Sequence, residues 1–383
     1  MTIYGVADVS VQGISASQSK ATTDAAGNVM QLQSNSSLLG FKGTEDLGNG
    51  LKAIFQAETG LDLVGNQQGS AADAAVSPSS PNGLFSSALR DTYVGLNSKY
   101  GTVLGGYLST PFRSALTSFA VEPGATGAMT IEKQMGAMRF GYDNVQFASS
   151  IRATALAYAM PTLYGFDGSI AYTGSNNNGT TNTTDIATCS NASVSACTAA
   201  PQSAFSFNLG WTGYGVNIKG AFSQFNNNVT PDANGAGNYG DYTSYLVGAM
   251  YTGIQNLKLS TVYNRNTLGT NGSVGTLTNG AGKLTNNQLY AGASYRMGNW
   301  EPAVSATWSS DVNGSLTQQL GSRQWQARVG YYLSKRTQAY GLISNLNNSA
   351  NQNFTFGQQT SSMGSGASGM NLFTYGVGMR TSF

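Results

Sequence analysis

The chain has 383 residues, with 19 Lys and Arg against 17 Asp and Glu and no His. Charged residues make up 9% of it, against roughly a quarter in ordinary soluble proteins, which excludes a surface that faces water throughout. The lack of His removes the usual general base for a Ser or Cys nucleophile, so we do not expect an enzyme. A net charge of +2 without any basic block argues against nucleic-acid binding.

The sequence contains no run of 18 apolar residues, so a membrane-spanning helix is not expected. It is nevertheless rich in Gly and Tyr, with 49 and 20 residues, and its mean hydropathy is −0.18. A transmembrane β-barrel has this combination, because its strands alternate lipid-facing and lumen-facing residues. A secreted Asn- and Gly-rich solenoid or adhesin has a similar composition, so the strand pattern has to separate the two classes.

Alternating runs begin at the N-terminus. In the first run, Ile3, Val9 and Val11 lie on one face, while Asp8 and Gln12 lie on the other. The same alternation recurs at 53–59, 92–97, 325–333 and 373–383. Charged residues take the parity opposite to the apolar stripe, as expected when one face meets lipid and the other an aqueous lumen.

Connections between the runs alternate in length. The short ones are 47–50, 98–101, 161–165, 213–215, 252–256, 297–299 and 334–336, and the long ones are 17–35, 62–83, 109–149, 174–202, 225–241, 267–287, 310–322 and 348–369. Together they predict an all-β fold, a 16-stranded antiparallel transmembrane β-barrel, with short periplasmic turns and long external loops. A solenoid would show a fixed repeat, and the sequence has none. We expect one barrel domain over residues 1–383.

Aromatic and sulfur-containing residues add two smaller expectations. Aromatic residues near strand ends fit interfacial girdles, namely Tyr4, Trp211, Tyr214, Tyr251, Trp300 and Tyr332. Cys189 and Cys197 are expected to form a small loop disulfide in an oxidising compartment, and without His nearby a metal site is not expected.

The connection at 109–149 is too long for an ordinary loop, which indicates a functional role. We expect it to fold into the lumen and narrow it. Its charged residues are candidates for the constriction: Arg113, Glu122, Glu132, Lys133 and Arg139. Asp8, Lys42 and Lys52 are candidates on the facing wall. For each charge, the alternative is a partner that ties the loop to the wall.

Five segments resemble the general porins of β-proteobacteria, of the neisserial and Burkholderia, Bordetella and Comamonas type. The most specific is Ser36 to Ala53, SSLLGFKGTEDLGNGLKA, and the others are 92–105, 157–161, 333–341 and 376–383. The resemblance implies a homotrimer in the bacterial outer membrane, in contact with its lipid and lipopolysaccharide. It also implies passive diffusion of small hydrophilic solutes and ions, without a cofactor, and a third external loop that forms the constriction.

The resemblance further implies that Phe383, at the end of an aromatic stripe, is the signal that the barrel assembly machinery reads. Because such a protein needs export and no signal peptide precedes the first strand, we expect the sequence to be that of the mature chain.

Two positions depart from the family pattern. Relatives usually place Arg where this chain has Leu38 and Gly106, and both positions face the lumen by parity. Fewer positive charges in the pore should weaken anion preference. Two alternatives stay open: a channel of the same fold that prefers one class of solute, and a non-channel outer-membrane adhesin.

Overall fold

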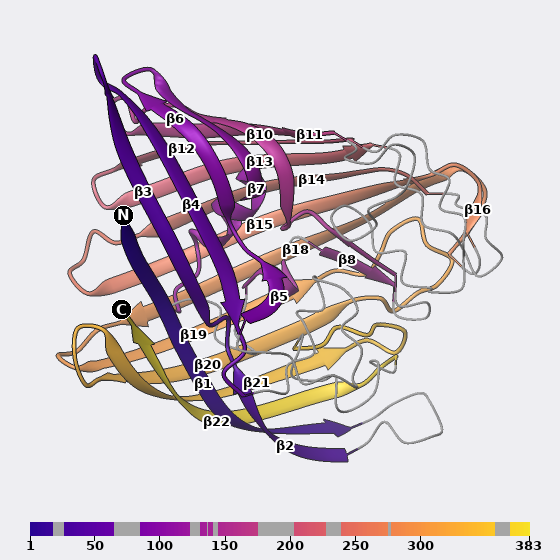
Figure 1. Cartoon of the computed structure of the whole chain (residues 1–383). Coiled ribbons are helices and arrows are strands. Elements are labelled where there is room, and N and C mark those ends of the chain that lie inside the picture. The colour runs from indigo at the N-terminus through magenta and orange to yellow at the C-terminus, as the bar shows by residue number, and fades with distance from the viewer. Residues whose placement is uncertain are drawn as a thin grey trace.

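A closed antiparallel β-barrel forms the body of the molecule (Figure 1). The computed structural model describes residues 1–17, 27–64, 85–122, 131–135, 137–140, 145–174, 203–226, 239–274, 277–356 and 368–383. The first strand, β1 (Thr2–Ser17), pairs along its length with the last, β22 (Asn371–Ser382). This pairing leaves no free edge, as hydrocarbon surroundings require.

The remaining wall strands follow one another around the barrel. They are β2 (Gly27–Ser34), β3 (Leu38–Gly48), β4 (Leu51–Leu61), β5 (Phe85–Leu89), β6 (Thr92–Ser98), β7 (Gly101–Ser109), β10 (Arg152–Ala159), β11 (Phe166–Thr173), β12 (Ser203–Gly213), β13 (Val216–Asn226), β14 (Tyr239–Tyr251), β15 (Leu257–Thr270), β18 (Gly282–Tyr295), β19 (Trp300–Ser309), β20 (Ser322–Tyr332) and β21 (Thr337–Asn348). A two-residue pair, β16 (Ser273–Val274) with β17 (Thr278–Asn279), stands apart from the wall.

The 18 segments of the main sheet make sixteen wall strands, because two wall strands are interrupted. Segments β2 and β3 both pair with β1, one after the other, and β5 and β6 both pair with β4. The prediction of sixteen strands is therefore confirmed.

The seven predicted short turns are also confirmed, and both termini lie at the end of the barrel that carries them (Figure 1). Two of the predicted long loops are too long. Residues 27–34 form a strand instead of loop, because Met30 and Leu32 face outward while Gln31 and Gln33 alternate with them. Likewise, β15 and β18 stay paired out to Thr270 and Gly282.

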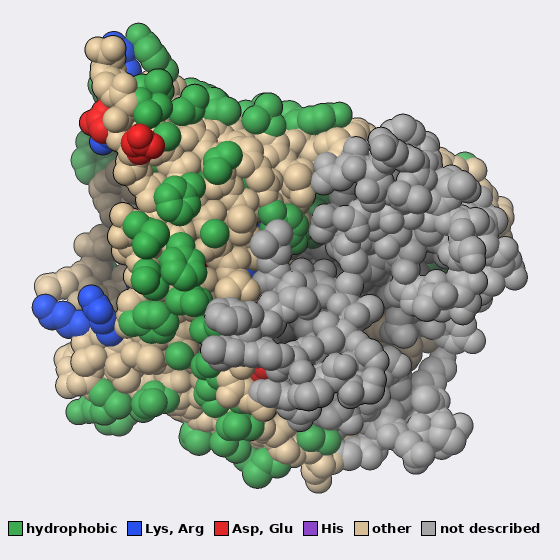
Figure 2. Space-filling model, in the orientation of Figure 1, with side chains coloured by type: hydrophobic (Ala, Val, Ile, Leu, Met, Phe, Trp, Pro, Cys, Tyr) green, Lys and Arg blue, Asp and Glu red, His purple; other side chains and the backbone are tan. Residues whose placement is uncertain are grey.

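Outward and inward faces alternate as predicted, but the expectation that charged residues take the inward parity is wrong for Arg265, Lys283 and Arg323, which are exposed on the outer face. On β20, the outward Trp325 and Val329 are 46% and 45% exposed, whereas the inward Gln326 and Arg328 are buried. Figure 2 shows hydrophobic side chains spread over the outer face, with charged side chains at the short-turn end. None of the helices in the described part of the chain has the length and apolar content that a membrane crossing requires.

The predicted aromatic girdle is wrong for two of its residues. Tyr4 turns to the lumen side, where its hydroxyl donates to Glu58 Oε1 at 2.7 Å. Tyr332 similarly donates to Glu301 Oε2 at 2.6 Å. Both side chains have the inward parity of their strands, so their hydroxyl groups bind carboxylates on the lumen side instead of lipid headgroups.

Candidate functional site

The inward loop between β7 and β10 is more regular than the sequence predicts. It contains α1 (Pro111–Thr117), α2 (Ile131–Gln134) and a short hairpin of β8 (Ala137–Phe140) and β9 (Val145–Ala148). Helix α1 begins at a clear signal, since the Thr110 hydroxyl accepts a hydrogen bond from the Arg113 backbone N–H and Pro111 occupies the first turn.

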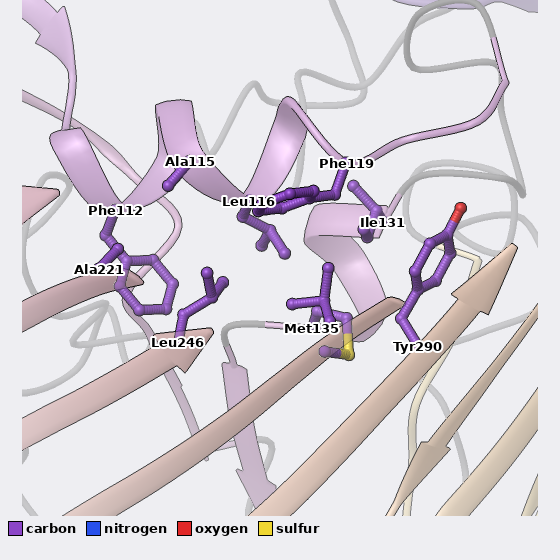
Figure 3. Close-up of a cluster of buried hydrophobic side chains, with 10 residues drawn as sticks. Phe112, Ala115, Leu116, Phe119, Ile131, Met135, Ala221, Leu246 and Tyr290 are labelled. Carbon is purple, nitrogen blue, oxygen red and sulfur yellow. The ribbon is translucent and has the colours of Figure 1, made fainter. Parts of the chain in front are cut away.

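Helix α1 packs its apolar face against the inner wall (Figure 3). Its buried side chains recur at helical spacing, a signal in the sequence that the loop prediction missed. The cluster on the loop side contains Phe112, Ala115, Leu116, Phe119, Ile131 and Met135, and on the wall side Ala221, Leu246, Val262 and Tyr290. The loop therefore lies against β13, β14, β15 and β18.

Small and polar wall residues allow this close approach. A Cβ placed on Gly248 would lie 2.5 Å from Phe119 Cε2, so a larger residue would push the loop away. The Ser260 hydroxyl donates to the Phe119 carbonyl oxygen at 2.6 Å. Asn208 Nδ2 donates to the Pro111 carbonyl oxygen at 2.8 Å. These contacts satisfy backbone groups of the loop that are buried against the wall.

Glu122 lies at the end of the docked stretch of the loop and holds it to the wall through hydrogen bonds. Its carboxylate accepts a hydrogen bond from the Ser305 hydroxyl at 2.5 Å, and longer ones from Tyr290 and Gln326, both at 3.4 Å. The residue is 3% exposed. Burial raises the pKa of the Glu122 carboxyl above its ordinary value, and the hydrogen bond from Ser305 partly opposes this shift. The side chain ties the loop to the wall.

Two other predicted loop charges pair with each other. Arg113 Nη2 lies 3.0 Å from Glu132 Oε1, and Arg113 Nη1 donates to the Ser150 carbonyl oxygen at 3.0 Å. Both side chains keep some exposure. Lys133 and Arg139 lie in α2 and β8, and their side chains are outside the described residues.

Two salt bridges close to where the inward loop leaves the wall were not predicted. Arg90 Nε lies 3.5 Å from Glu58 Oε2, and Arg152 Nε lies 3.1 Å from Asp91 Oδ1. Arg90 lies next to the break between β5 and β6, where the alternation that identifies lumen residues is lost. Position alone could not place its side chain.

Asp8, on β1, belongs to a second group of charges, whose other members lie on β20, β21 and β22. It is fully buried and accepts hydrogen bonds from Tyr340 at 2.6 Å and Asn35 at 3.2 Å, with Arg380 Nη1 at 3.4 Å. Arg328, also buried, stacks 4.5 Å from the centre of the Tyr340 ring. Arg328 and Arg380 both have the lumen parity, which could have identified them from the sequence.

The wall lysines are less enclosed. Lys42 Nζ lies 5.0 Å from the centre of the Tyr4 ring, and Lys52 is exposed near the start of β4. Leu38 takes the lumen parity of Lys42, as predicted from its place in the strand.

Gly106 also lies on the lumen face, where it pairs with Tyr93 of the neighbouring strand. Its backbone conformation explains why this position holds glycine. Its φ is +150°, and a Cβ would lie 2.3 Å from the Thr92 carbonyl oxygen. An arginine at this position would require a local change of backbone.

Two remaining predictions concern residues away from the lumen. Cys189 and Cys197 lie outside the described residues. Phe383 closes the β1–β22 seam, since its backbone exchanges hydrogen bonds with Gly5 at 3.0 and 3.1 Å. Its ring is 52% exposed.

Comparison with solved structures shows the same fold over the whole chain. The anion-selective porin from Comamonas acidovorans covers 100% of this chain and 99% of its own, with a TM-score of 0.66 and 19% identity. The trimer form of OmpT, an outer membrane protein of Vibrio cholerae, covers 100% and 98%, with a TM-score of 0.59 and 12% identity. Identities this low show likeness of fold alone.

Sequence comparison adds the family. The major outer membrane protein P.IB of Neisseria gonorrhoeae is 28% identical over 186 residues, which span 47% of this chain and 44% of that relative. The chain thus covers less than half the length of this curated relative. The Gram-negative porin family matches residues 1–351. By this match and by its closed sixteen-stranded barrel, the chain belongs to the Gram-negative porin family of the outer membrane.

Proposed function

We propose that the chain forms a water-filled channel for passive diffusion of small hydrophilic solutes and ions, with weak ion selectivity. Membership of the porin family and a barrel of sixteen strands support a channel, because a barrel of this size leaves an aqueous passage. The whole chain, residues 1–383, acts as one barrel unit, and no enzymatic step is needed for this role.

The pairing of lumen charges supports weak selectivity. Four arginines each lie within 4 Å of a carboxylate, in the pairs Arg90–Glu58, Arg113–Glu132, Arg152–Asp91 and Arg380–Asp8. A paired charge contributes less to the potential that a passing ion meets than an isolated charge does. Leu38 and Gly106 add no charge of their own.

A salt gradient across a planar bilayer tests this proposal. The reversal potential should stay close to zero, and strong anion selectivity would contradict weak selectivity while leaving the channel itself intact. Current that saturates with solute concentration would instead indicate a channel that prefers one class of solute. Absence of conductance from correctly folded protein would leave the adhesin alternative.

We further infer that the chain assembles as a homotrimer, contacts lipopolysaccharide and is recognised by the barrel assembly machinery through Phe383. Support comes from the solved trimer form of the similar fold and from the exposed terminal ring. Heating a detergent extract should convert an SDS-resistant trimer to monomer. Replacing Phe383 with Ala should lower the amount of assembled protein in the outer membrane, with total synthesis unchanged.

A further inference from the structure

Three positively charged side chains face outward from the barrel, near the strand ends that connect to the long loops. They are Arg265 on β15, Lys283 on β18 and Arg323 on β20, and all three are exposed. Their parity matches that of exposed apolar neighbours, such as Tyr263, Leu289 and Trp325. The three therefore lie on the outer face of the barrel.

Their position in the membrane follows from the cost of exposing charge to lipid. A Lys or Arg on the lipid face costs roughly 2–4 kcal/mol at the bilayer midplane and about 0–1 near the interface. Arg265 and Arg323 also lie beside Tyr263 and Trp308, aromatic residues of the kind that mark headgroup depth. The cations therefore lie at the level of the external headgroups.

No ion pair neutralises these cations within the part of the chain that the structure describes. Arg265 donates to the amide oxygen of Asn287 at 3.3 Å. Asp241 on β14 is the nearest outward acid in the register, two strands from Lys283. The local excess is positive.

An apolar groove lies on the same strands. It has a volume of about 820 Å³ and crosses the outer face of β14, β15, β18, β19 and β20. Its floor is made of small residues paired across neighbouring strands, among them Thr261, Ala291 and Ala306, and its sides include Leu259 and Trp325.

The groove leads toward the cations. Arg323 lies two residues beyond Trp325 on β20, and Arg265 lies four residues beyond Thr261 on β15. The two arginines are three strands apart, roughly 14 Å across the sheet at ordinary strand spacing. A ligand with more than one anionic group could therefore contact both.

We propose that this face binds a phosphate-bearing, multi-chain lipid of the outer leaflet, the chemistry of lipid A. An acyl chain lies in the groove, and the phosphate groups contact Arg265 and Arg323. Lys283 lies beyond Arg265, at the end of β18 that connects to a long loop. The complementary charge and the depth of the cations favour this occupant over a neutral lipid. The inference rests on the proposed contact with lipopolysaccharide and gives it a location.

Native mass spectrometry of the full chain in detergent, with purified bisphosphorylated lipid A as the probe, tests the site. R265Q/R323Q should weaken retention about five-fold for each cation removed. Ala306→Trp, which fills the groove floor, should also weaken it. K335Q/R336Q removes the same charge from a short turn at the opposite end and should leave binding unchanged.

Three results would overturn the site. They are equal retention by R265Q/R323Q and wild type, equal retention of dephosphorylated lipid A, or loss of retention in K335Q/R336Q as well. If wild type retains no lipid and R265Q/R323Q loses its oligomer, the face is a contact between copies, which also overturns the proposal. Conductance of R265Q/R323Q in a planar bilayer should be unchanged, so failure of the lipid site remains distinguishable from failure of the channel.

Discussion

The carboxylate of Glu122 accepts a 2.5 Å hydrogen bond from the Ser305 hydroxyl, and this contact fastens the end of the docked loop to β19. Replacing Ser305 with Ala removes the shortest hydrogen bond to a buried carboxylate. Losing such a partner costs about 1–3 kcal/mol. We expect S305A to release the loop part of the time, which should appear as increased open-channel current noise. Ser344→Ala, a change on β21 away from the loop, is the control, and equal noise in both variants would contradict the anchor.

Protonation of Glu122 should strengthen docking. Because burial raises its pKa, the docked loop binds the proton more tightly than the released loop, whose carboxyl has an ordinary pKa of about 4.3. Docking is therefore favoured most below that value and weakens as pH rises through the raised pKa. Glu122 lies on the inward loop, outside the membrane-spanning strands.

Current noise recorded between pH 4 and 8 measures this effect, and it should increase with pH. Glu122→Gln keeps a neutral side chain at every pH and should abolish the dependence. A pH dependence that persists unchanged in E122Q would assign it to another group.

Gly248 is required for the loop to approach β14. A Cβ there would lie 2.5 Å from the Phe119 ring, so Gly248→Ala should destabilise docking by roughly 1–3 kcal/mol through overpacking. Limited proteolysis within residues 111–121 should become faster. Gly220→Ala on β13 is the matched control, because its nearest contact would be at 3.8 Å. Equal cleavage of the two variants would show that the space at Gly248 is not limiting.

The salt bridge between Arg90 and Glu58 predicts that removing either partner changes the ion selectivity, in opposite directions for the two residues. Glu58→Gln leaves Arg90 without its carboxylate and should shift the reversal potential toward anions. Arg90→Gln leaves the carboxylate and should shift it toward cations. Shifts of the same sign in both variants, measured under one salt gradient, would be inconsistent with charges that line the ion path.

Restoring arginine at the two altered positions should have unequal results. Leu38→Arg extends from regular strand into the lumen and should increase anion preference while the barrel stays heat-stable. Gly106→Arg places a side chain where φ is +150° and the Thr92 carbonyl oxygen is 2.3 Å from the Cβ, so it should lower thermal stability. Circular dichroism melting compares the two, and equal stability would contradict the backbone argument.

The barrel could be predicted from the sequence because each strand repeats its pattern locally. In the first run, Ile3 and Val11 already lie on one face and Asp8 on the other, and short turns mark where one strand ends and the next begins. The interruption before Leu38 could not be predicted in this way. It depends on Asn35, whose amide reaches Asp8, Ser10 and Tyr340, and Tyr340 is 305 residues away in the chain.

The candidate site was only partly predictable for a similar reason. The loop's position and its charged residues follow from the sequence, but the partners do not. Glu122 accepts a hydrogen bond from Ser305, which is 183 residues later in the chain. The helix that contains Phe112 and Leu116 lies in a segment interpreted from the sequence as an irregular loop. Pairings across the lumen depend on which wall the loop docks against, and that choice is made by packing.

The docked loop makes the two halves of the barrel mechanically unequal. Strands β13, β14, β15 and β18 have a second layer behind them, so their inner apolar residues are held on both sides. Strands β3 and β4 have no comparable hydrophobic cluster among the residues that the structure describes. On heating or lateral stretching of the bilayer, the wall at β3 and β4 should separate first, with the strands behind the docked loop remaining as the last ordered part of the wall.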